Sequence, residues 1–312
     1  MTAEAPAASA PTASVVVCTY TAARGDLLRD ALRRVGAQLL PGDELIVVVD
    51  HDDRLRDAIA ADEPRARVVA NAGAPGLSGA RDSGIAAARG DVVVFLDDDA
   101  LPRPGWLSAL REAFADPRIE AVGGAVIPRW ERGRPGWFPD ELGWIVGCDY
   151  RGLPGDGAPI RNPIGANMGI RRGTLTRVGS FDGALGRDAR RPMGCEETEL
   201  AIRIRRESPG AGIVRIASAA VDHVVPPARA TVAYALRRAW YEGISKGRLT
   251  ARVGLGDGLA SERRYVMRTL SAGVARHVGA AVTARDPAGI ARALVLLAAT
   301  ATTAAGFLAG RR

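Results

Sequence analysis

The sequence predicts an α/β fold in which a mostly parallel sheet is flanked by helices. Short runs of Val and Ile alternate with amphipathic stretches through the first hundred residues, which is typical of parallel strands covered by helices on both faces. Polar residues directly follow these runs, at the edge of the sheet where α/β proteins bind their ligands. The chain has 312 residues, of which 47% are hydrophobic and 25% charged. This length and composition allow a large buried core and exclude a wholly disordered protein.

Four strands and three helices are expected between residues 14 and 100. Apolar runs predict strands at residues 14–18, 44–49, 66–70 and 91–96. Helices are expected between them, the first with Leu27, Leu28, Ala31, Leu32 and Val35 on its apolar face and the others at residues 52–61 and 77–89. Right-handed crossovers bring the C-terminal ends of parallel strands to one edge of the sheet. The side chains expected at that edge are Thr19, Tyr20, Asp50, Asn71, Asp97, Asp98 and Asp99.

The segments on either side of this region are predicted to differ from it. Residues 1–13 are rich in Ala, Pro, Ser and Thr and have neither a basic start nor an apolar stretch, so we expect a disordered tail rather than a signal peptide. Residues 101–225 are expected to form a less regular half. It contains a helix around Trp106–Phe114, strands at residues 119–127, 165–171 and 213–216 with an apolar continuation at 221–223, and a helix at 196–206. Residues 128–163 are expected to form an irregular pocket wall, in which Trp130, Trp137 and Trp144 either stack on the rings of a ligand or anchor the loop.

Residues 226–312 are expected to form a helical extension. One helix is expected at residues 234–246, and residues 293–310 are eighteen residues without a charge. A helix of that length is about 27 Å long, close to the ~30 Å of a bilayer core. Its Ala- and Thr-rich composition leaves two interpretations open, which are contact with a membrane and burial in the domain or in an oligomer.

Charge and cysteine content narrow the choice of partners. Lys and Arg number 42 against 35 Asp and Glu, which gives a net charge of +7, but no basic cluster interleaved with aromatic residues is present. Nucleic acid is therefore not an expected partner, and the charge favours phosphate-bearing ligands or an anionic membrane face. Cys18, Cys148 and Cys195 show no CxxC spacing. That excludes a disulfide scaffold and a cysteine zinc site and agrees with a reducing compartment.

Three carboxylates at the end of the fourth predicted strand give the clearest sign of chemistry. Asp97, Asp98 and Asp99 follow Phe95 and Leu96 directly. Like charges ~4 Å apart repel by about 4 kcal/mol at an effective dielectric near 20, so such a cluster favours a bound cation. Mg²⁺ or Mn²⁺ would fit, with positions left for a diphosphate. On an extended chain Asp97 and Asp99 point the same way. The alternative is a solvated acidic turn.

Other candidate residues lie before and after this cluster. Asp50 ends the second strand, where it could accept a hydrogen bond from a base or a ribose hydroxyl, while Asp52 suits a helix N-cap. Glu196 and Glu197 begin a predicted helix. Acids are common there because they interact with the helix dipole, but one of the two could act as a general base. His223 follows an apolar stretch and, taken alone, favours a structural role.

In order along the chain, these motifs resemble those of family 2 glycosyltransferases with the GT-A fold. The resemblance covers residues 14–225 and rests on the sequences VCTY at 17–20, VVD at 48–50, GARDSG at 79–84, FLDDD at 95–99, GANM at 165–168 and CEETEL at 195–200. It divides this region into a nucleotide-sugar-binding half, residues 14–100, and an acceptor half, residues 101–225. The segment RRAWY at 237–241 is similar to the region that follows the catalytic core in membrane-associated members.

The resemblance implies an inverting transfer of a sugar from a nucleoside diphosphate sugar, expected to be a UDP-sugar, to a hydroxyl or lipid-phosphate acceptor. The acceptor would be a glycan or a polyprenyl-linked molecule, and the protein would work in the cytoplasm at the inner face of the cell membrane. Thr19, Tyr20, Asp50, Arg81, Asp97 and Asp98 would bind the donor, and Asp97, Asp99 and His223 would hold Mg²⁺ or Mn²⁺.

The resemblance also implies a catalytic base in the later helix. The family usually has Glu-Asp there, with the second acid as the base. The matching residue is Glu197, one methylene longer, so Glu196 stays a second candidate. Two other interpretations are a sugar-1-phosphate nucleotidyltransferase and an inactive homologue that binds carbohydrate or lipid. The first would need a basic, Gly-rich phosphate loop, and residues 18–26 offer only Arg24 and Gly25.

Overall fold

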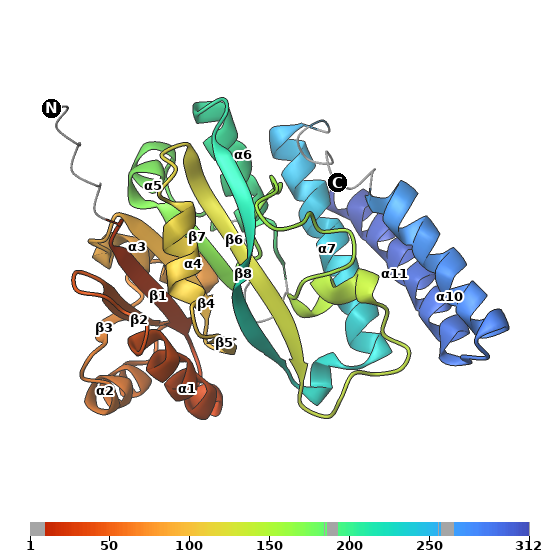
Figure 1. The fold of residues 1–312 in the computed structure, drawn as a ribbon, viewed down its shortest axis with the longest axis horizontal. Helices are drawn as coiled ribbons and strands as arrows, with labels where there is room; N and C mark the ends of the chain where they lie inside the picture. Colours follow the sequence, from red (N-terminus) through yellow and green to blue (C-terminus); the bar gives the residue numbers. More distant parts are fainter. Residues whose placement is uncertain (1–9, 184, 186–192, 255, 257–264, 312) are drawn as a thin grey trace, which may run out of the picture.

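The computed structural model describes residues 10–183, 185, 193–254, 256 and 265–311. They form one eight-stranded sheet with helices on both faces and a helical extension beyond one end of it (Figure 1). The first nine residues of the predicted tail lie outside the described residues. Thr12 already bonds to Asp91 through its backbone nitrogen (2.9 Å) and its hydroxyl (2.8 Å), and Ala13 is the first residue of a strand.

The sheet is mixed, with strand order β3-β2-β1-β4-β7-β6-β8-β5. The strands are β1 Ala13–Thr19, β2 Glu44–Val49, β3 Arg67–Ala70, β4 Val92–Asp97, β5 Ala100–Pro102, β6 Ile119–Trp130, β7 Asn167–Arg171 and β8 Gly212–Val225. The first four are mutually parallel, as the Val- and Ile-rich runs predict. β7 joins β4 and β6 in antiparallel orientation, and β8 is parallel to β6.

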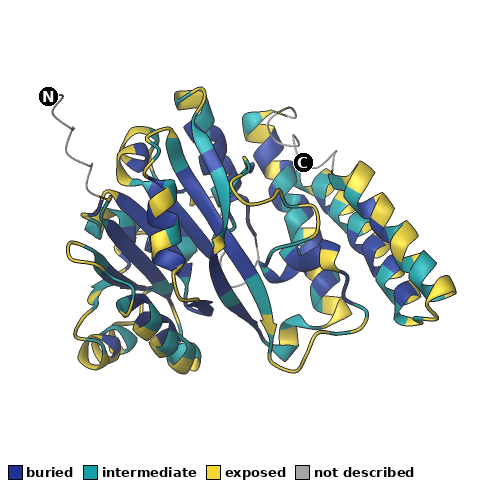
Figure 2. Ribbon diagram, in the orientation of Figure 1, coloured by how far each residue is buried: buried dark blue, intermediate teal, exposed yellow. Residues whose placement is uncertain are grey.

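Helices cover the two faces of the sheet because successive strand residues point to opposite sides. Val15 and Val17 pack in one core with residues of α1 (Gly25–Gly36), α2 (Asp53–Asp62) and α4 (Trp106–Ala113). Val16 packs in the other core with residues of α3 (Leu77–Ala87), α5 (Arg172–Val178) and α6 (Glu196–Glu207). Figure 2 shows the buried sheet between these layers. Asp52 is the N-cap of α2, since its side chain accepts from the Leu55 nitrogen.

Two predicted elements are longer in the structure. The runs at residues 213–216 and 221–223 form one strand, β8, because a register shift between Gly124 and Ala125 of β6 takes up the residues between them. The helix predicted at residues 234–246 extends over Val232–Val253 as α7, and Thr231 caps its start. β5 is too short for a periodic pattern to reveal it. Its pairing with β8 places Ala100 opposite His223.

Within the described residues, the C-terminal extension is a helical layer that contains α7, η4 (Tyr265–Leu270), α10 (Ser271–Thr283) and α11 (Ala288–Gly310). α11 crosses α7 at very close range, because Gly243 and Gly306 meet where the helices touch. A Cβ atom on Gly306 would lie 2.3 Å from the Trp240 carbonyl oxygen, and one on Gly243 would lie 2.1 Å from that of Thr303. The apolar segment at residues 293–310 therefore has one face buried within the protein.

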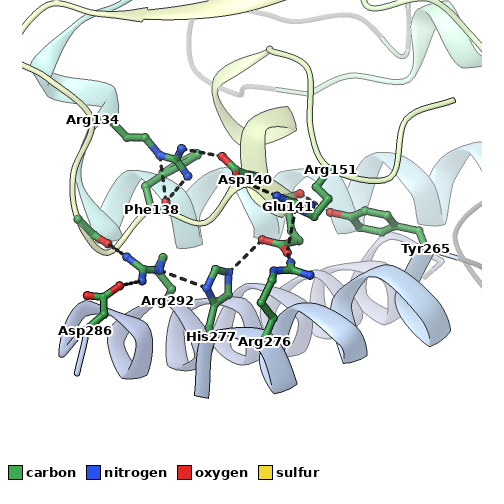
Figure 3. A network of polar contacts seen from close by, with 11 residues as sticks. Arg134, Phe138, Asp140, Glu141, Arg151, Tyr265, Arg276, His277, Asp286 and Arg292 are labelled. Carbon is green, nitrogen blue, oxygen red and sulfur yellow. Dashed lines mark hydrogen bonds and ion pairs between the residues drawn. The ribbon is translucent and has the colours of Figure 1, made fainter. Parts of the chain in front are cut away.

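A polar network fixes this layer to the loop around η2 (Asp140–Val146), as Figure 3 shows. The fully buried carboxylate of Glu141 is bonded by Arg276 and by His277 Nε2, the latter at 3.2 Å. The Tyr265 hydroxyl donates to the Glu141 carbonyl oxygen, and Arg292 of α11 donates to that of Gly136 at 2.8 Å. The irregular loop thus connects the sheet to the C-terminal helices.

Candidate active site

A cavity of about 1960 Å³ opens at the C-terminal ends of the parallel strands and extends between α6, α7 and α11. Every residue that the sequence indicated for the donor, the metal or the base lines this cavity. These residues are Thr19, Tyr20, Asp50, Arg81, Asp97, Asp98, Asp99, Glu196, Glu197 and His223. The structure therefore brings together side chains that lie up to two hundred positions apart in the chain.

Asp97, Asp99 and His223 form a group that could hold a metal ion. Asp97 is the last residue of β4, and one ligand atom from each of the three residues lies within 4.8 Å of the others. The pairing of β5 with β8 sets this arrangement, because it places Asp99, just before β5, with Oδ1 3.2 Å from His223 Nε2. Two carboxylates and an imidazole suit a divalent cation such as Mn²⁺, with positions left for a ligand.

Asp99 and His223 form a buried pair of opposite charge when no cation is bound. Burial acts to raise the pKa of Asp99, but the charges of His223, Arg24 and Arg229 outweigh it and hold that pKa well below its usual range. Burial acts to lower the pKa of His223, but Asp99 raises it to about 10. The Cys148 sulfur lies 3.6 Å from the other ring nitrogen, Nδ1. Without a bound cation, this pair therefore carries one negative and one positive charge at neutral pH, and a cation bound by His223 Nε2 would replace the proton on that nitrogen.

Asp98 lies outside the metal group, although it shares one partner, Arg24, with Asp99. It accepts a hydrogen bond from the Thr19 hydroxyl at 2.8 Å and one from Arg24 Nη1 at 2.5 Å, and burial raises its pKa. Arg24 Nη1 is also 3.1 Å from Asp99 Oδ2. Thr19 and Asp98 thus bond to each other at the cavity wall. Arg24, which the sequence had not placed in the site, is a cation shared by both aspartates.

Asp50 and Tyr20 line the cavity at the ends of β2 and β1, where the sequence predicts that the nucleotide binds. The Asp50 carboxylate accepts hydrogen bonds from Asn71 Nδ2 (2.6 Å) and from the Gly76 nitrogen (2.8 Å), and lies 2.8 Å from His51 Nδ1. Burial acts to raise its pKa, but these bonds hold it below the usual value. Tyr20 is 61% exposed, with its ring 5.8 Å from the Arg24 guanidinium. A carboxylate held in place and an exposed ring can contact the hydroxyls and the base of a nucleoside.

Arg81 lies at the centre of the site, between the metal group and the glutamates. This buried guanidinium donates to Glu197 Oε1 at 3.0 Å and to the Gly165 carbonyl oxygen at 3.1 Å. It is 3.7 Å from Glu196 Oε1 and 3.8 Å from Asp97 Oδ1. Burial acts to lower its pKa, but the carboxylates around it keep it raised, so Arg81 stays charged. One arginine therefore fixes the position of both candidate bases relative to Asp97.

The two glutamates differ in their access to the cavity. The side chain of Glu196 is 2% exposed, whereas that of Glu197 is 17% exposed. Gly165 is needed for this arrangement, because a Cβ atom there would lie 1.9 Å from Glu197 Oε1 and 2.5 Å from Arg81 Nη2. Glu197 is thus the carboxylate that a substrate in the cavity can reach more easily.

Of the three tryptophans in the irregular region, only Trp144 lines the cavity. Trp130 packs edge-on against Phe138, with ring centroids 4.9 Å apart, and Trp137 contacts the same ring at 5.5 Å. Trp130 and Trp137 therefore anchor the loop.

Several other residues line the cavity without a role predicted from the sequence, and three of them lie next to the site. Arg229 is 3.7 Å from Asp99, Cys148 contacts His223, and Arg238 of α7 is buried beside Gly194. No local signal marks them, because arginine is frequent throughout this chain and the contacts join distant segments. Of the three, only Arg238 lies in a segment that the sequence marks, RRAWY at 237–241.

Comparison with known proteins agrees with this geometry. Residues 14–179 match the family described as Glycosyl transferase family 2. The chain is 33% identical over 238 residues to the glucosyl-dolichyl phosphate glucuronosyltransferase of Haloferax volcanii, and the match covers 75% of each protein.

Solved structures share the fold. The mannosyltransferase PcManGT from Pyrobaculum calidifontis, in complex with GDP-Man and Mn²⁺, superposes with a TM-score of 0.58 at 18% identity, covering 95% of this chain and 88% of that one. GalNAc-T7 with UDP, GalNAc and Mn²⁺ gives a TM-score of 0.52 at 16% identity, covering 83% of this chain and 54% of that one. The helix-flanked sheet expected from the sequence is thus confirmed as that of the GT-A glycosyltransferases.

Proposed function

The chain belongs to glycosyltransferase family 2, and on that premise we propose that it transfers a sugar from a nucleoside diphosphate to a phosphate-linked lipid acceptor with inversion at the anomeric carbon. One observation carries the proposal. A cation-binding group and a glutamate held by Arg81 line the same cavity, with Arg81 contacting Glu197 on one side and Asp97 on the other. This is the arrangement that a single displacement requires.

The donor would lie along the ends of β1, β2 and β4. Asp50 and Tyr20 would contact the nucleoside, and the diphosphate would lie near Asp97, Asp99 and Arg24. A divalent cation bound by Asp97, Asp99 and His223 would offset the negative charge on the leaving diphosphate. UDP is the expected nucleotide. GalNAc-T7 was solved with UDP, but PcManGT was solved with GDP-Man, so both must be tested.

Glu197 would be the base because it is the more accessible of the two glutamates. It takes the proton of the attacking hydroxyl as the acceptor oxygen bonds to the anomeric carbon. The bond from that carbon to the phosphate oxygen breaks, and its electron pair leaves with the nucleoside diphosphate. Attack from the side opposite the leaving group inverts the configuration. Arg81 keeps the carboxylate ionised and oriented, which makes it a positioning residue.

Two observations support a lipid-linked acceptor: the name of the Haloferax relative and the apolar residues at the α11 end of the cavity. The Haloferax protein is named for action on glucosyl-dolichyl phosphate. In this chain the cavity continues past Glu197 to α11, where Ala304, Phe307 and Leu308 line it. An apolar wall beyond the reaction centre suits the isoprenoid part of a lipid-linked acceptor.

A lipid acceptor places the protein at a membrane, and we propose that α10 and α11 face it. α11 is the one helix in the described ranges that is long and apolar enough to cross a bilayer, with a mean hydropathy of 1.8 over its best window. Its contacts with α7 bury one side, while Ile290, Leu294 and Leu297 are exposed on it. This arrangement suits a helix that lies on the surface of the cytoplasmic leaflet.

The experiment is a transfer assay with UDP- and GDP-sugars, Mn²⁺ and a polyprenyl phosphate or glycosyl polyprenyl phosphate acceptor. We expect one donor class to be used, an inverted product and no activity in EDTA. In Glu197→Gln, kcat should fall by at least about a hundredfold with donor affinity unchanged. Glu196→Gln is the matched control and should retain more activity. Nucleotide binding without turnover in any combination would indicate an inactive homologue instead.

A further inference from the structure

Arg238 is a buried cation in the cavity whose bonding capacity the described residues do not use fully. It is 7% exposed and lines the cavity from α7. Its Nη1 is 2.9 Å from Glu242 Oε2, but without the angles of a hydrogen bond, and within the described part of the chain no acceptor bonds its Nε either. A buried guanidinium whose N–H groups lack acceptors costs free energy, unless a ligand accepts hydrogen bonds from it.

Arg238 lies beside the first turn of α6, which contains the candidate bases. A Cβ atom on Gly194, two residues before Glu196, would lie 3.4 Å from Arg238 Nη2 and 3.9 Å from Glu242 Oε2. The guanidinium therefore borders the acceptor side of the reaction centre. The metal group and Asp50 lie elsewhere in the cavity. The two aspartates of the metal group are at the end of β4, His223 is on β8, and Asp50 follows β2.

The cavity wall around Arg238 carries more positive than negative charge. Residues 159–165, α6 and α7 contribute Arg161, Arg205, Arg206, Arg238 and Lys246 against the three acids Glu196, Glu197 and Glu242. Glu242 is shared between Arg238 and Lys246, the latter at 3.2 Å. Arg205 donates to the carbonyl oxygens of Ile160 and Ala201 and faces no carboxylate in the described ranges. Such a wall attracts an anion.

The same wall continues into apolar surface. Thr303, Ala304, Phe307 and Leu308 of α11 line the cavity together with Arg238. A lipid-linked acceptor has a nucleophile, a phosphate and a hydrocarbon chain. Along the cavity, the glutamates suit the nucleophile, Arg238 suits the phosphate, and the apolar side chains of α11 suit the hydrocarbon chain.

We propose that Arg238 binds the phosphate of the lipid acceptor, with the hydrocarbon chain lying against α11. The inference rests on the proposed function and specifies where the acceptor phosphate binds. A guanidinium suits this role because it presents paired N–H donors to phosphate oxygens.

The test uses the full-length protein with UDP, Mn²⁺ and three probes: farnesyl phosphate, farnesol and inorganic phosphate. Wild-type protein should bind farnesyl phosphate at least about tenfold more tightly than either of the others. In Arg238→Gln the preference for farnesyl phosphate over farnesol should disappear, while farnesol binding and UDP binding stay the same. A merely structural role would weaken both lipids equally, and that outcome would overturn the proposal.

Two further variants complete the design. Arg237→Gln removes the same charge from the neighbouring, exposed position of α7 and should leave the preference intact. Arg238→Lys keeps the charge without the paired donors, so it should retain part of the preference, and it serves if the glutamine variant does not fold.

The donor sugar is a second molecule that can carry an anionic group to Arg238. If Arg238→Gln changed the use of UDP-glucuronic acid relative to UDP-glucose and left farnesyl phosphate binding intact, the arginine would bind a sugar carboxylate and the proposal would be wrong. A failure of this proposal can be told apart from a failure of the proposed function. If the wild-type protein did not bind UDP, the proposed donor site would be wrong, whereas the role of Arg238 is judged only from the binding of the two lipids.

Discussion

Arg81 Nη1 lies 3.0 Å from Glu197 Oε1, although the two residues are 116 positions apart in the chain. The contact joins α3, on the proposed nucleotide side of the cavity, to α6, on the proposed acceptor side. The same guanidinium is close to Asp97 and bonded to the Gly165 carbonyl oxygen. The position of the proposed base is therefore tied directly to the position of the proposed metal group.

Gly165→Ala should reduce kcat without unfolding the protein. The added methyl group would overlap Glu197 Oε1 and Arg81 Nη2, so both side chains must move. A displacement of about 1 Å at a catalytic group reduces the rate by roughly a hundredfold. Steady-state kinetics and thermal unfolding measure the two effects. Gly155→Ala is the control, since its Cβ would meet no atom within 4 Å. Equal kcat values in both variants would show that Glu197 need not lie where it does.

Asp99→Asn should weaken the Mn²⁺-dependent binding of UDP by at least about tenfold. The substitution keeps the shape of the side chain but removes a charge that faces His223 Nε2 at 3.2 Å. Calorimetric titration of UDP with Mn²⁺ and with EDTA provides the measurement. Asp116→Asn, at a partly exposed aspartate paired with Arg118, should bind UDP like the wild type. Unchanged affinity in Asp99→Asn would remove Asp99 from the metal group.

Gly306→Ala should destabilise the packing of α11 on α7 by about 1–3 kcal/mol. A Cβ atom at this position would lie 2.3 Å from the Trp240 carbonyl oxygen, so the helices must separate. Thermal or urea unfolding would report the change. Gly279→Ala on α10 faces open space and should stabilise its helix by up to about 1 kcal/mol. The two alanines should therefore have opposite effects, and the same effect from both would contradict the close crossing.

Glu242 should contribute stability that is lost in acid. Burial acts to raise its pKa, but Lys246 and Arg238 lower it from 4.5 to about 2. A carboxylate with a depressed folded-state pKa contributes fully above its unfolded value, and the contribution falls as the pH drops from about 4.5 towards 2. The shift corresponds to about 3 kcal/mol at most. Urea unfolding of wild type and Glu242→Gln should thus differ at pH 7, and the difference should shrink below about pH 4.5 and vanish only as the pH approaches 2. A gap independent of pH would show that the pair is not ionic.

The double substitution Leu294→Asp and Leu297→Asp should weaken binding to vesicles that contain phosphatidylglycerol by tenfold or more. Burying one such side chain contributes about 1.5–3 kcal/mol. Both residues are exposed on α11, at 61% and 55%, so the free energy of unfolding should change little. Leu40→Asp, at an exposed leucine in the nucleotide half, is the control for vesicle sedimentation. Equal sedimentation of all three proteins would rule out α11 as the membrane face.

The sequence alone determined the parallel strands of the first hundred residues, their polar ends and the family. β1, β2 and β4 are runs of Val and Ile whose burial is encoded locally, so both their positions and the side chains that follow them could be predicted. The placement of Asp50 and Asp97 at one edge then follows because the strands are parallel, so their C-terminal ends lie at the same edge of the sheet. The N-cap at Asp52 is equally local, because it requires only a bond to a backbone nitrogen three residues on.

Only the tertiary structure decided which of these side chains act together. β5 and β8 pair across more than a hundred residues to place Asp99 beside His223, and Gly165 lets Arg81 reach Glu197. The sequence marked the segment that contains Arg238, but only the structure places its guanidinium beside Gly194, just before α6. The physical reason is that periodicity reports which face of an element is buried. The partner of a buried charge is set by the packing of elements that are distant in the chain.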